Sequence, residues 1–327
     1  MIKNIFIRIS KSISYRLSYK FYDIHRKLKW KPTIVSDQDT IRSIIDGHKS
    51  LARFGDGEIR LMEGENITFQ DYDLNLSQKL REVIFSNNDK VCIAIPIGLA
   101  DLKANNIKEQ SFWYHHLYYN LSTWYKYLKR DRIYSNSQIS RFYSTTDAFI
   151  DKDYKAKDIA SKRIELLKKL WNNRECLFVE GEYSRLGVGN RCFDNARSIR
   201  RILCPSVNAF SHYNEILDSI KKNIHEGELV IIALGPTATV MAYDLSEIGI
   251  QSLDMGHVDI EYEWWRMKAV GKKGIRGKYS NEAVWGGSQK SFVEGELSKE
   301  EIEQYEREII DRIVGDADCI SSRERVK

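Results

Sequence analysis

The sequence has few cysteines, and their spacing excludes two kinds of structural cross-link. The five are Cys92, Cys176, Cys192, Cys204 and Cys319. No pair has the C-x-x-C spacing of a structural zinc site, and an odd number of cysteines argues against a disulfide framework. Cysteines inside apolar runs behave as small hydrophobic residues, and a reducing cytoplasm is their natural setting.

Long apolar runs are also missing. No stretch approaches the roughly 18 to 20 apolar residues of a membrane span. Arg8, Lys11 and Arg16 interrupt the N-terminus, where a signal peptide would need a continuous apolar core. The chain also lacks internal repeats, a P-loop and the three-glycine dinucleotide fingerprint. The expectation is therefore a cytoplasmic globular protein.

What the chain does have is the composition of a folded domain. It has 327 residues, of which 42% are hydrophobic and 30% are charged, enough for one large α/β domain. The formal net charge of +5 is too small for the whole chain to bind nucleic acid by electrostatics. No nucleic-acid partner is therefore expected, and the sequence leaves the oligomeric state open.

The N-terminal segment differs from the rest of the chain. Residues 1–31 carry nine Lys or Arg against a single acid, Asp23. In a helix, its apolar residues would share one face: Ile5, Ile9, Ile13, Leu17 and Phe21. Such a basic amphipathic segment suits an anionic membrane surface, and it suits an ordinary packing helix or a poorly ordered extension equally well. Residues 1–36 are therefore expected to be an extension of the domain.

From residue 37 to residue 327 the pattern predicts a single α/β domain. Helices are predicted over 40–54, 77–86, 111–130, 155–172, 210–224, 238–248 and 298–314. Strands are predicted over 91–98, 176–180, 200–205, 229–234 and 251–254. Helices between short apolar strands imply right-handed crossovers, and hence a Rossmann-like, mainly parallel sheet flanked by helices. Ligands of such sheets bind beyond the C-terminal ends of the strands.

Residues 53–60 read RFGDGEIR and place two carboxylates one glycine apart. Glycine on both sides of Asp56 is typical of a solvated turn, and these eight residues alone favour that interpretation. If the backbone is bent, Asp56 and Glu58 would instead converge on one hard cation. The choice depends on the other strand ends.

The strand at 176–180 leads into the segment GEYSRLGVGN. This loop presents Glu182, Arg185, Gly187 and Asn190. Glycines let a ligand approach the backbone closely, and the fork of an arginine side chain can grip a diphosphate. A flexible connection with surface salt bridges would have a similar composition, but a phosphate site is the favoured interpretation.

Two further strand ends carry polar residues. The strand at 229–234 runs into Gly235 and Thr237 at a helix N-terminus, which suits either an anion or a simple cap. The strand at 251–254 runs into His257, Asp259 and Glu261, of which the first and last would share one face of a helix. A cation, a diphosphate site and a base are the parts that sugar transfer from a nucleotide donor needs.

Four of these segments, in this order, resemble a known family. RFGDGE, EGEYSRLGVGN with the following FDNARSIRRILCP, ALGPTATVMAYDLS and DMGHVDIEYEW are similar to bacterial glycosyltransferases with the GT-D fold, over about residues 40–290. The resemblance implies a Rossmann-like domain, a UDP-sugar donor and a divalent ion, Mn²⁺ or Mg²⁺. It further implies that Asp56 and Glu58, the Asp-x-Glu motif, bind the ion.

The resemblance implies roles for other residues as well. Arg185, Asn190 and Asn195 would contact the nucleotide, Thr237 would contact phosphate, and the acceptor base would be His257, Asp259 or Glu261. Arg53 would either orient the two metal-binding carboxylates or touch the donor phosphate.

The expected reaction transfers a hexose of the glucose or galactose type to a glycan, with inversion. The glycan would belong to a surface polysaccharide, such as a capsule or O-antigen, or to a glycoprotein. A lipid-linked oligosaccharide acceptor at the inner face of the membrane would suit the basic extension. Two alternatives remain: a metal-dependent phosphoesterase acting on nucleotide-sugars, and a non-catalytic nucleotide-sugar-binding scaffold.

Overall fold

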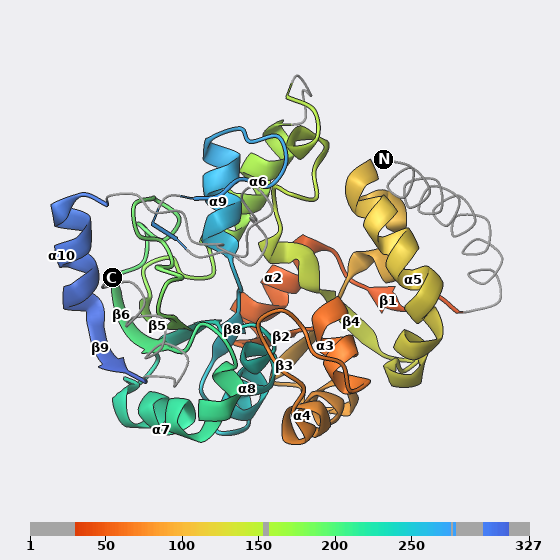
Figure 1. The fold of residues 1–327 in the computed structure, drawn as a ribbon, viewed down its shortest axis with the longest axis horizontal. Coiled ribbons are helices and arrows are strands. Elements are labelled where there is room, and N and C mark those ends of the chain that lie inside the picture. The colour runs from red at the N-terminus through yellow and green to blue at the C-terminus, as the bar shows by residue number, and fades with distance from the viewer. Residues whose placement is uncertain (1–29, 153–156, 276, 279–296, 314–327) are drawn as a thin grey trace, which may run out of the picture.

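One parallel β-sheet organises the protein. The computed structural model describes residues 30–152, 157–275, 277–278 and 297–313. Within them lies a nine-stranded sheet, parallel throughout, in the order β1-β4-β3-β2-β8-β7-β5-β6-β9 (Figure 1). The strands are β1 (Thr33–Ile34), β2 (Ser50–Arg53), β3 (Val91–Ile95), β4 (Ile133–Asn136), β5 (Glu175–Gly181), β6 (Ser198–Cys204), β7 (Leu229–Ala233), β8 (Ser252–Asp254) and β9 (Ile309–Arg312). The predicted α/β class with a parallel sheet is confirmed.

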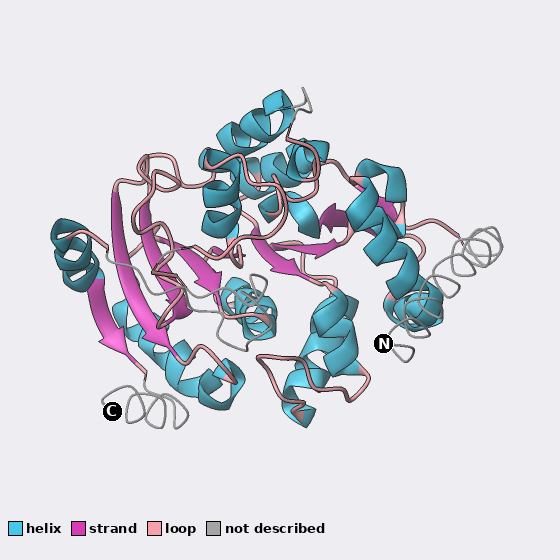
Figure 2. Ribbon diagram, turned by 45° about the horizontal axis from the view of Figure 1, so that its top comes forward, coloured by secondary structure: helices cyan, strands magenta, loops and turns pink. Residues whose placement is uncertain are grey.

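Helices cover both faces of this sheet (Figure 2). They are α2 (Asp37–Asp46), α3 (Asp56–Met62), α4 (Leu74–Phe85), α5 (Ile107–Tyr127), α6 (Lys157–Lys168), α7 (Tyr213–Asn223), α8 (Pro236–Glu247), α9 (Val258–Arg266) and α10 (Lys299–Glu308). Helices α3, α4, α5, α7 and α8 share one buried apolar cluster with the sheet, whereas α2, α6 and α9 share the other. The sheet is therefore the middle of three layers.

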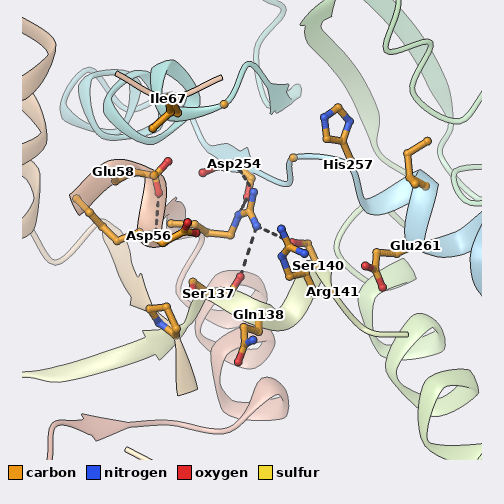
Figure 3. A pocket seen from close by; sticks show the side chains of 18 of the residues that line it. Asp56, Glu58, Ile67, Ser137, Gln138, Ser140, Arg141, Asp254, His257 and Glu261 are labelled. Carbon is orange, nitrogen blue, oxygen red and sulfur yellow. Dashed lines mark hydrogen bonds and ion pairs between the residues drawn. The ribbon is translucent and has the colours of Figure 1, made fainter. Parts of the chain in front are cut away.

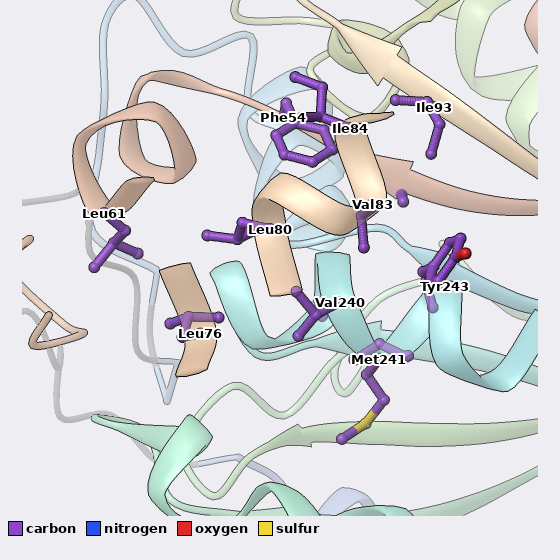
Figure 4. Packing of buried hydrophobic residues seen from close by; sticks show 14 of the residues in the cluster. Phe54, Leu61, Leu76, Leu80, Val83, Ile84, Ile93, Val240, Met241 and Tyr243 are labelled. Carbon is purple, nitrogen blue, oxygen red and sulfur yellow. The ribbon is translucent and has the colours of Figure 1, made fainter. Parts of the chain in front are cut away.

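The central strands are apolar on both sides because both faces are covered. In β7, Val230 and Ile232 belong to one cluster, and Leu229 and Ile231 belong to the other. This alternation follows from the two-residue period of a strand, and it explains why the sequence shows continuous apolar runs here. On the first face, α4 packs between α3 and α8, with Leu80 near the centre (Figure 4).

The order of the strands reverses in the middle of the sheet. The chain runs outward from β2 through β3 to β4, crosses to β5 and β6, and returns through β7 to β8. Strand β8 thus pairs with β2, with Leu253 in register with Leu51. After β2 the chain goes to β3, and after β8 it goes to β9 at the opposite edge. Such a reversal opens a crevice beyond the C-terminal ends of the strands.

The prediction of one helix over 40–54 is wrong in its second half. Helix α2 follows Ser36, whose hydroxyl caps it by accepting a hydrogen bond from the backbone N–H of Asp39, and it ends at Asp46. Residues Ser50–Arg53 form the central strand β2 instead. Leu51 is buried in one apolar cluster and Ala52 in the other, and a segment buried on both faces suits a strand.

The helix predicted over 298–314 is also only partly correct. Ser298 and Glu301 form a capping box at the start of α10, which ends at Glu308. The next residues, Ile309–Arg312, form β9 and pair with β6. Strands β1 and β4, with two and four residues, are too short for their pattern to stand out in the sequence, and neither was predicted.

The extension predicted over residues 1–36 lies mostly outside the described residues, which begin at Trp30. Its membrane contact therefore stays a prediction. Trp30 packs edge to face on Tyr125 of α5, with ring centroids 5.0 Å apart. Among the described helices, none combines the length and apolar content needed to cross a bilayer. The cysteines of the described part, Cys92, Cys176, Cys192 and Cys204, are buried and unbridged.

Candidate active site

A cavity of about 410 Å³ lies at the crevice. Residues that follow five strands line it, among them Asp56 after β2, Pro96 after β3, Gln138 after β4, Gly235 after β7 and His257 after β8. Figure 3 shows Asp56 and Glu58 on one side of Asp254, and His257 and Glu261 on the other. The structure thus brings together three of the four segments in which the sequence placed functional residues.

Asp56 and Glu58 lie in the first turn of a helix. The segment predicted as a solvated turn is the start of α3, with Gly55 as its N-cap. The Glu58 carboxylate folds back and accepts a hydrogen bond from the Gly55 backbone N–H at 2.6 Å. Acids are favourable at a helix N-terminus because the helix dipole is positive there. The prediction of a turn is therefore wrong, although both carboxylates do line the cavity, as the cation hypothesis requires.

The environment of Glu58 disfavours a negative charge. Burial, and after it the charge of Asp254, raises the pKa of Glu58 from 4.5 to about 7, and the hydrogen bonds to the carboxylate do not reverse this. A cation bound beside Asp56 and Glu58 would remove that penalty. Strongly shifted carboxyls in a cavity are typical of functional sites.

Arg53 is held by hydrogen bonds at the centre of the cavity wall. Its Nε donates to the carbonyl oxygen of Asp254 at 2.6 Å, and its Nη2 donates to the Asp254 carboxylate at 2.7 Å. Its Nη1 donates to the Ser140 hydroxyl at 2.6 Å. A Cβ on Gly256, at φ +50°, would lie 2.6 Å from Nη2 of Arg53, so only glycine fits there. These bonds hold Asp254, which is neither of the two proposed metal-binding carboxylates, so both roles expected for Arg53 stay predictions.

The start of α8 contributes a helix N-terminus. Gly235, at φ +55°, approaches Phe69 so closely that a Cβ would lie 2.5 Å from the ring. Thr237 follows in the first turn, fully buried, and its hydroxyl oxygen has no hydrogen-bond partner. The backbone N–H groups of such a turn attract anions. Gly235 lines the cavity, whereas Thr237 lies just behind it.

The three candidate bases have different surroundings. His257 precedes α9 and lines the cavity. Glu261, one turn later, also lines the cavity, and its Oε2 accepts hydrogen bonds from the backbone N–H groups of Tyr143 at 3.0 Å and Ser144 at 2.7 Å. Asp259 is 1% exposed and is not part of the cavity lining.

Asp259 is instead part of a buried ion pair. Its Oδ2 accepts hydrogen bonds from Lys278 Nζ at 2.5 Å and from the backbone N–H of Gly187 at 3.2 Å. These contacts join α9 to the loop after β5. Asp259 is therefore the candidate base that this geometry favours least.

The five residues predicted to bind the nucleotide, between β5 and β6, do not line the first cavity. Gly187 and Asn190 line a second cavity of about 580 Å³ beside β6 and α10. Arg185 Nη1 donates to the carbonyl oxygen of Gly277 at 3.0 Å, and Asn195 Nδ2 donates to the carbonyl oxygen of Lys168 at 2.8 Å. The backbone N–H of Glu182 bonds to the end of β6, and its carbonyl oxygen accepts from Tyr305. The expected nucleotide contacts of this loop stay predictions, and the structure brings none of these five residues into the first cavity.

Other lining residues were missed by the sequence analysis. They include Trp113 of α5 and Gln138 and Arg141 near the end of β4. Strand β4 is too short for its end to be recognised, and Trp113 lies in an aromatic-rich segment that looks like ordinary core. A prediction of β4 would have placed Gln138 at the same sheet edge.

The donor set fits a divalent ion that a substrate helps to bind. No group of three or more His, Cys, Asp or Glu in the described part of the chain is arranged to hold a metal. Two carboxylates, Asp56 and Glu58, are nevertheless sufficient for Mg²⁺ or a similar ion, which is commonly bound by one or two carboxylates and the phosphates of a substrate.

Comparison with known proteins identifies the family. The family profile described as "Glycosyltransferase GT-D fold" matches residues 51–283. The chain belongs to this GT-D family.

Glycosyltransferase GlyD of Streptococcus pneumoniae serotype 4 is 38% identical over 245 residues, which are 75% of this chain and 29% of GlyD. The probable glycosyl transferase Gly of Streptococcus gordonii is 37% identical over 251 residues, 76% of this chain and 35% of that protein. The chain thus spans about a third of the length of these curated relatives.

Solved GT-D structures have the same fold. A structure described as showing that domain of unknown function 1792 has a distinct glycosyltransferase fold superposes with a TM-score of 0.76 at 33% identity, covering 92% of this chain and 98% of that one. A structure described as a new glycosyltransferase from Streptococcus sanguinis gives a TM-score of 0.76 at 32% identity, covering 87% of this chain and all of that chain. The resemblance seen in the motifs is confirmed.

Proposed function

We propose that this GT-D protein is a metal-dependent glycosyltransferase that moves a hexose from a UDP-sugar to a hydroxyl of a glycan acceptor, with inversion. One observation carries the proposal. A single cavity is lined by Asp56 and Glu58 on one side, by His257 and Glu261 on the other, and also by Gly235 at the N-terminus of α8. These groups match the needs of a departing diphosphate and of an attacking hydroxyl.

The diphosphate would lie between α3 and α8. Asp56 and Glu58 would hold Mn²⁺ or Mg²⁺, which when bound neutralises the charge of the departing diphosphate. The N-terminus of α8, at Gly235 and Thr237, would add backbone N–H groups and the positive end of the helix dipole. Arg53 holds Asp254 in place between the two sides of the cavity.

The acceptor would enter on the side of α9. We place the base at His257 or Glu261, because Asp259 is buried in its ion pair with Lys278. The base takes the proton of the acceptor hydroxyl, the hydroxyl oxygen bonds to the anomeric carbon, and the bond from that carbon to the diphosphate oxygen breaks. A single displacement of this kind inverts the anomeric carbon.

The test is release of UDP from a panel of UDP-sugars, with and without Mn²⁺ and with and without glycan acceptors. We expect release that requires both the ion and an acceptor. Free sugar formed without any acceptor would instead indicate a phosphoesterase. Tight UDP binding with no turnover under any condition would indicate a non-catalytic scaffold, and either result would reject the proposal.

The proposed cellular acceptor follows from the relatives and from the basic N-terminal segment. Both curated relatives are streptococcal proteins named as glycosyltransferases, the second as a probable one. We propose an acceptor in a surface polysaccharide or glycoprotein, reached at the inner membrane face if residues 1–31 bind anionic lipid. Deletion of residues 1–31 should then abolish sedimentation with anionic vesicles, and unchanged sedimentation would reject the membrane contact.

A further inference from the structure

Two residues that line the cavity each have a buried polar atom without a hydrogen-bond partner, and the proposed reaction assigns neither residue a role. Gln138 lies in the 3-10 helix η3 (Ser137–Ser140) that follows β4, and Trp113 lies on α5; both line the cavity. The two residues are 7% and 4% exposed. Oε1 of Gln138 and Nε1 of Trp113 are buried, and neither has a hydrogen-bond partner. Buried polar atoms are nearly always paired, so two unpaired atoms in one cavity wall point to a ligand.

Trp113 is an exception among the buried tryptophans of the described residues. The indole N–H groups of the other three donate to protein acceptors: Trp124 to His116, Trp171 to Cys192 and Trp264 to Lys273. The unpaired N–H at Trp113 is therefore not a general property of this core.

The two atoms have complementary hydrogen-bonding roles. An indole N–H only donates, and an amide oxygen only accepts. A ligand that satisfies both must accept one hydrogen bond and donate another. A hydroxyl does this, whereas an ionised phosphate or carboxylate oxygen has no proton to donate and an ammonium group cannot accept.

The Trp113 ring is held firmly in its position. A Cβ on Gly98 would lie 3.1 Å from the indole, so the ring rests directly on the backbone there. Phe112 and His116 contact it edge to face, each with a centroid separation of 5.4 Å. A donor fixed in this way loses little entropy when it binds a ligand.

Gln138 is positioned by its neighbours on η3. Its backbone N–H donates to Asn136 Oδ1 at 3.0 Å, and Asn136 Nδ2 donates to Asp37 of α2 at 2.6 Å. The side chain of Asn136 thus joins the start of η3 to α2. The backbone at Gln138 is therefore tied to α2 through Asn136.

The place of these residues in the sheet suits a sugar. Gln138 follows β4 and Gly235 follows β7, and four steps between neighbouring strands separate them. At roughly 4.8 Å per step, this distance is about 19 Å. Asp56 and Glu58, after β2, lie between the two. If the diphosphate binds at the α8 end of the cavity, the β4 end is left for a sugar, either that of the donor or that of the acceptor.

We propose that Gln138 and Trp113 belong to a subsite that recognises hydroxyl groups of a pyranose and so determines which sugar the enzyme accepts. This inference rests on the proposed glycosyltransferase function. The hydroxyls belong either to the sugar of the donor or to the acceptor, and the two cases give different kinetics. Both residues are specificity-determining, because they contact the sugar and not the bond that breaks.

The test uses Gln138→Met and Trp113→Phe, which remove the polar atom and keep an apolar side chain. Trp171→Phe is the matched control, because it removes a paired indole N–H outside the cavity. Binding of UDP, UDP-glucose and UDP-galactose in the presence of Mn²⁺ is measured by calorimetry. The KM values for these donors and for a panel of octyl glycosides are measured by UDP release.

We expect UDP itself to bind both cavity variants as it binds the wild-type protein. If the hydroxyls are on the donor, affinity for the preferred UDP-sugar falls at least ten-fold and the preference between UDP-glucose and UDP-galactose is largely lost. If they are on the acceptor, the donor constants are unchanged and the KM for the octyl glycoside rises at least ten-fold. Donor and acceptor constants that both stay within two-fold of wild type would overturn the subsite.

Unfolding of the ligand-free protein gives an independent readout. Removing an unpaired buried N–H removes a desolvation penalty, so Trp113→Phe should lower the midpoint of thermal unfolding less than Trp171→Phe does. An equal or larger drop would mean that the indole N–H of Trp113 has a partner in the protein, and would also reject the subsite. Failure of the proposed function is distinguishable from failure of the subsite. A wild-type protein that binds no UDP-sugar would reject both the function and the subsite. Normal transfer by the wild-type protein, with donor and acceptor constants unchanged in the variants, would reject the subsite alone.

Discussion

Two regions of this chain have the acids, arginines and glycines of a ligand site, but their side chains are paired very differently. In the loop after β5 and its surroundings, the charged groups neutralise one another. Arg201 donates to Glu180 at 2.5 Å and to Glu308 at 2.7 Å. The guanidinium comes from β6, and the two carboxylates come from β5 and α10. Asp259 and Lys278 form a second buried pair nearby.

In the first cavity, by contrast, the charges are poorly compensated. Asp56 and Glu58 face the same space, and the pKa of Glu58 is raised to about 7 by burial and by Asp254. Buried polar atoms without a partner occur in both regions, at Trp113, Gln138 and Thr237 in the first and at Asn190, Asn195 and Asp259 in the second. The regions therefore differ in how their charges are paired: matched ion pairs hold the second region together, whereas two carboxylates that share one space are suited to a cation.

The largest expected effect is on catalysis at the first cavity. Asp56→Asn removes one carboxylate of the proposed ion site and should lower kcat/KM at least 10³-fold, which corresponds to about 4 kcal/mol. Steady-state UDP release with saturating Mn²⁺ measures it. Glu65→Gln, in the exposed pair with Arg60, is the matched control and should change kcat/KM less than two-fold. Nearly full activity in Asp56→Asn would reject the ion site.

The second region should respond in stability instead of activity. Arg201→Met leaves the buried Glu180 carboxylate without its guanidinium and should lower the free energy of unfolding by about 3 to 5 kcal/mol. Urea unfolding measures the loss, and the fraction that remains folded should keep its kcat. Lys168→Met breaks the more exposed pair with Asp194 and should cost at most about 1 kcal/mol. A large fall in kcat for Arg201→Met would contradict the contrast between the regions.

A smaller effect is expected in the pH dependence of stability. Because the pKa of Glu58 is raised in the folded protein, that protein binds this proton more tightly than the unfolded chain does. The resulting stabilisation is complete below about pH 4.5 and is lost as the pH rises through about 7. Without metal, Glu58→Gln should therefore be more stable than wild type at pH 8, on the order of 2 kcal/mol.

Glu58 also belongs to the proposed ion site, so its protonation should control the binding of Mn²⁺. Mn²⁺ should stabilise the wild-type protein at pH 8 and should do so much less at pH 5.5, where Glu58 is protonated. Glu58→Gln should lose most of the response to Mn²⁺ at both pH values. Thermal unfolding with and without the ion measures these differences, and a pH-independent response equal in both proteins would contradict the assignment.

The smallest effects are expected at the loop that the sequence assigned to the nucleotide. Asn190→Ala and Asn195→Ala lie outside the first cavity, and each should change kcat/KM for the donor less than two-fold. Asn195 bonds to the carbonyl oxygen of Lys168, so any cost should appear in stability. A ten-fold loss of donor affinity in either variant would show that this loop reaches the nucleotide after all.

The sequence predicted five of the nine strands of the sheet, β3, β5, β6, β7 and β8. Apolar runs such as Leu229–Ala233 are conspicuous when every side chain is buried, and a parallel sheet then places the following residues at one edge. This logic correctly brought Gly235, His257 and Glu261 into one cavity from two separate segments, and the family resemblance added Asp56 from a third.

What the sequence could not show depends on contacts between distant segments. The direction of the loop after β5 is set by bonds from Arg185 to Gly277 and from Asp259 to Gly187 and Lys278, and local composition does not predict such partners. Gln138 was missed because β4 has only four residues, too few for its alternation to be recognised.

The pairing of β2 with β8 also determines when the site can form. Arg53 and Asp254 lie 201 residues apart in the chain, yet their contact holds the centre of the cavity together. Contacts of such long range form late and slow the folding of a domain. At roughly 5 to 20 residues per second, the ribosome needs about 10 to 40 s to synthesise the segment between them. Asp56 and Glu58 therefore leave the ribosome long before Asp254 does. An active enzyme is thus one in which the whole central sheet has already assembled.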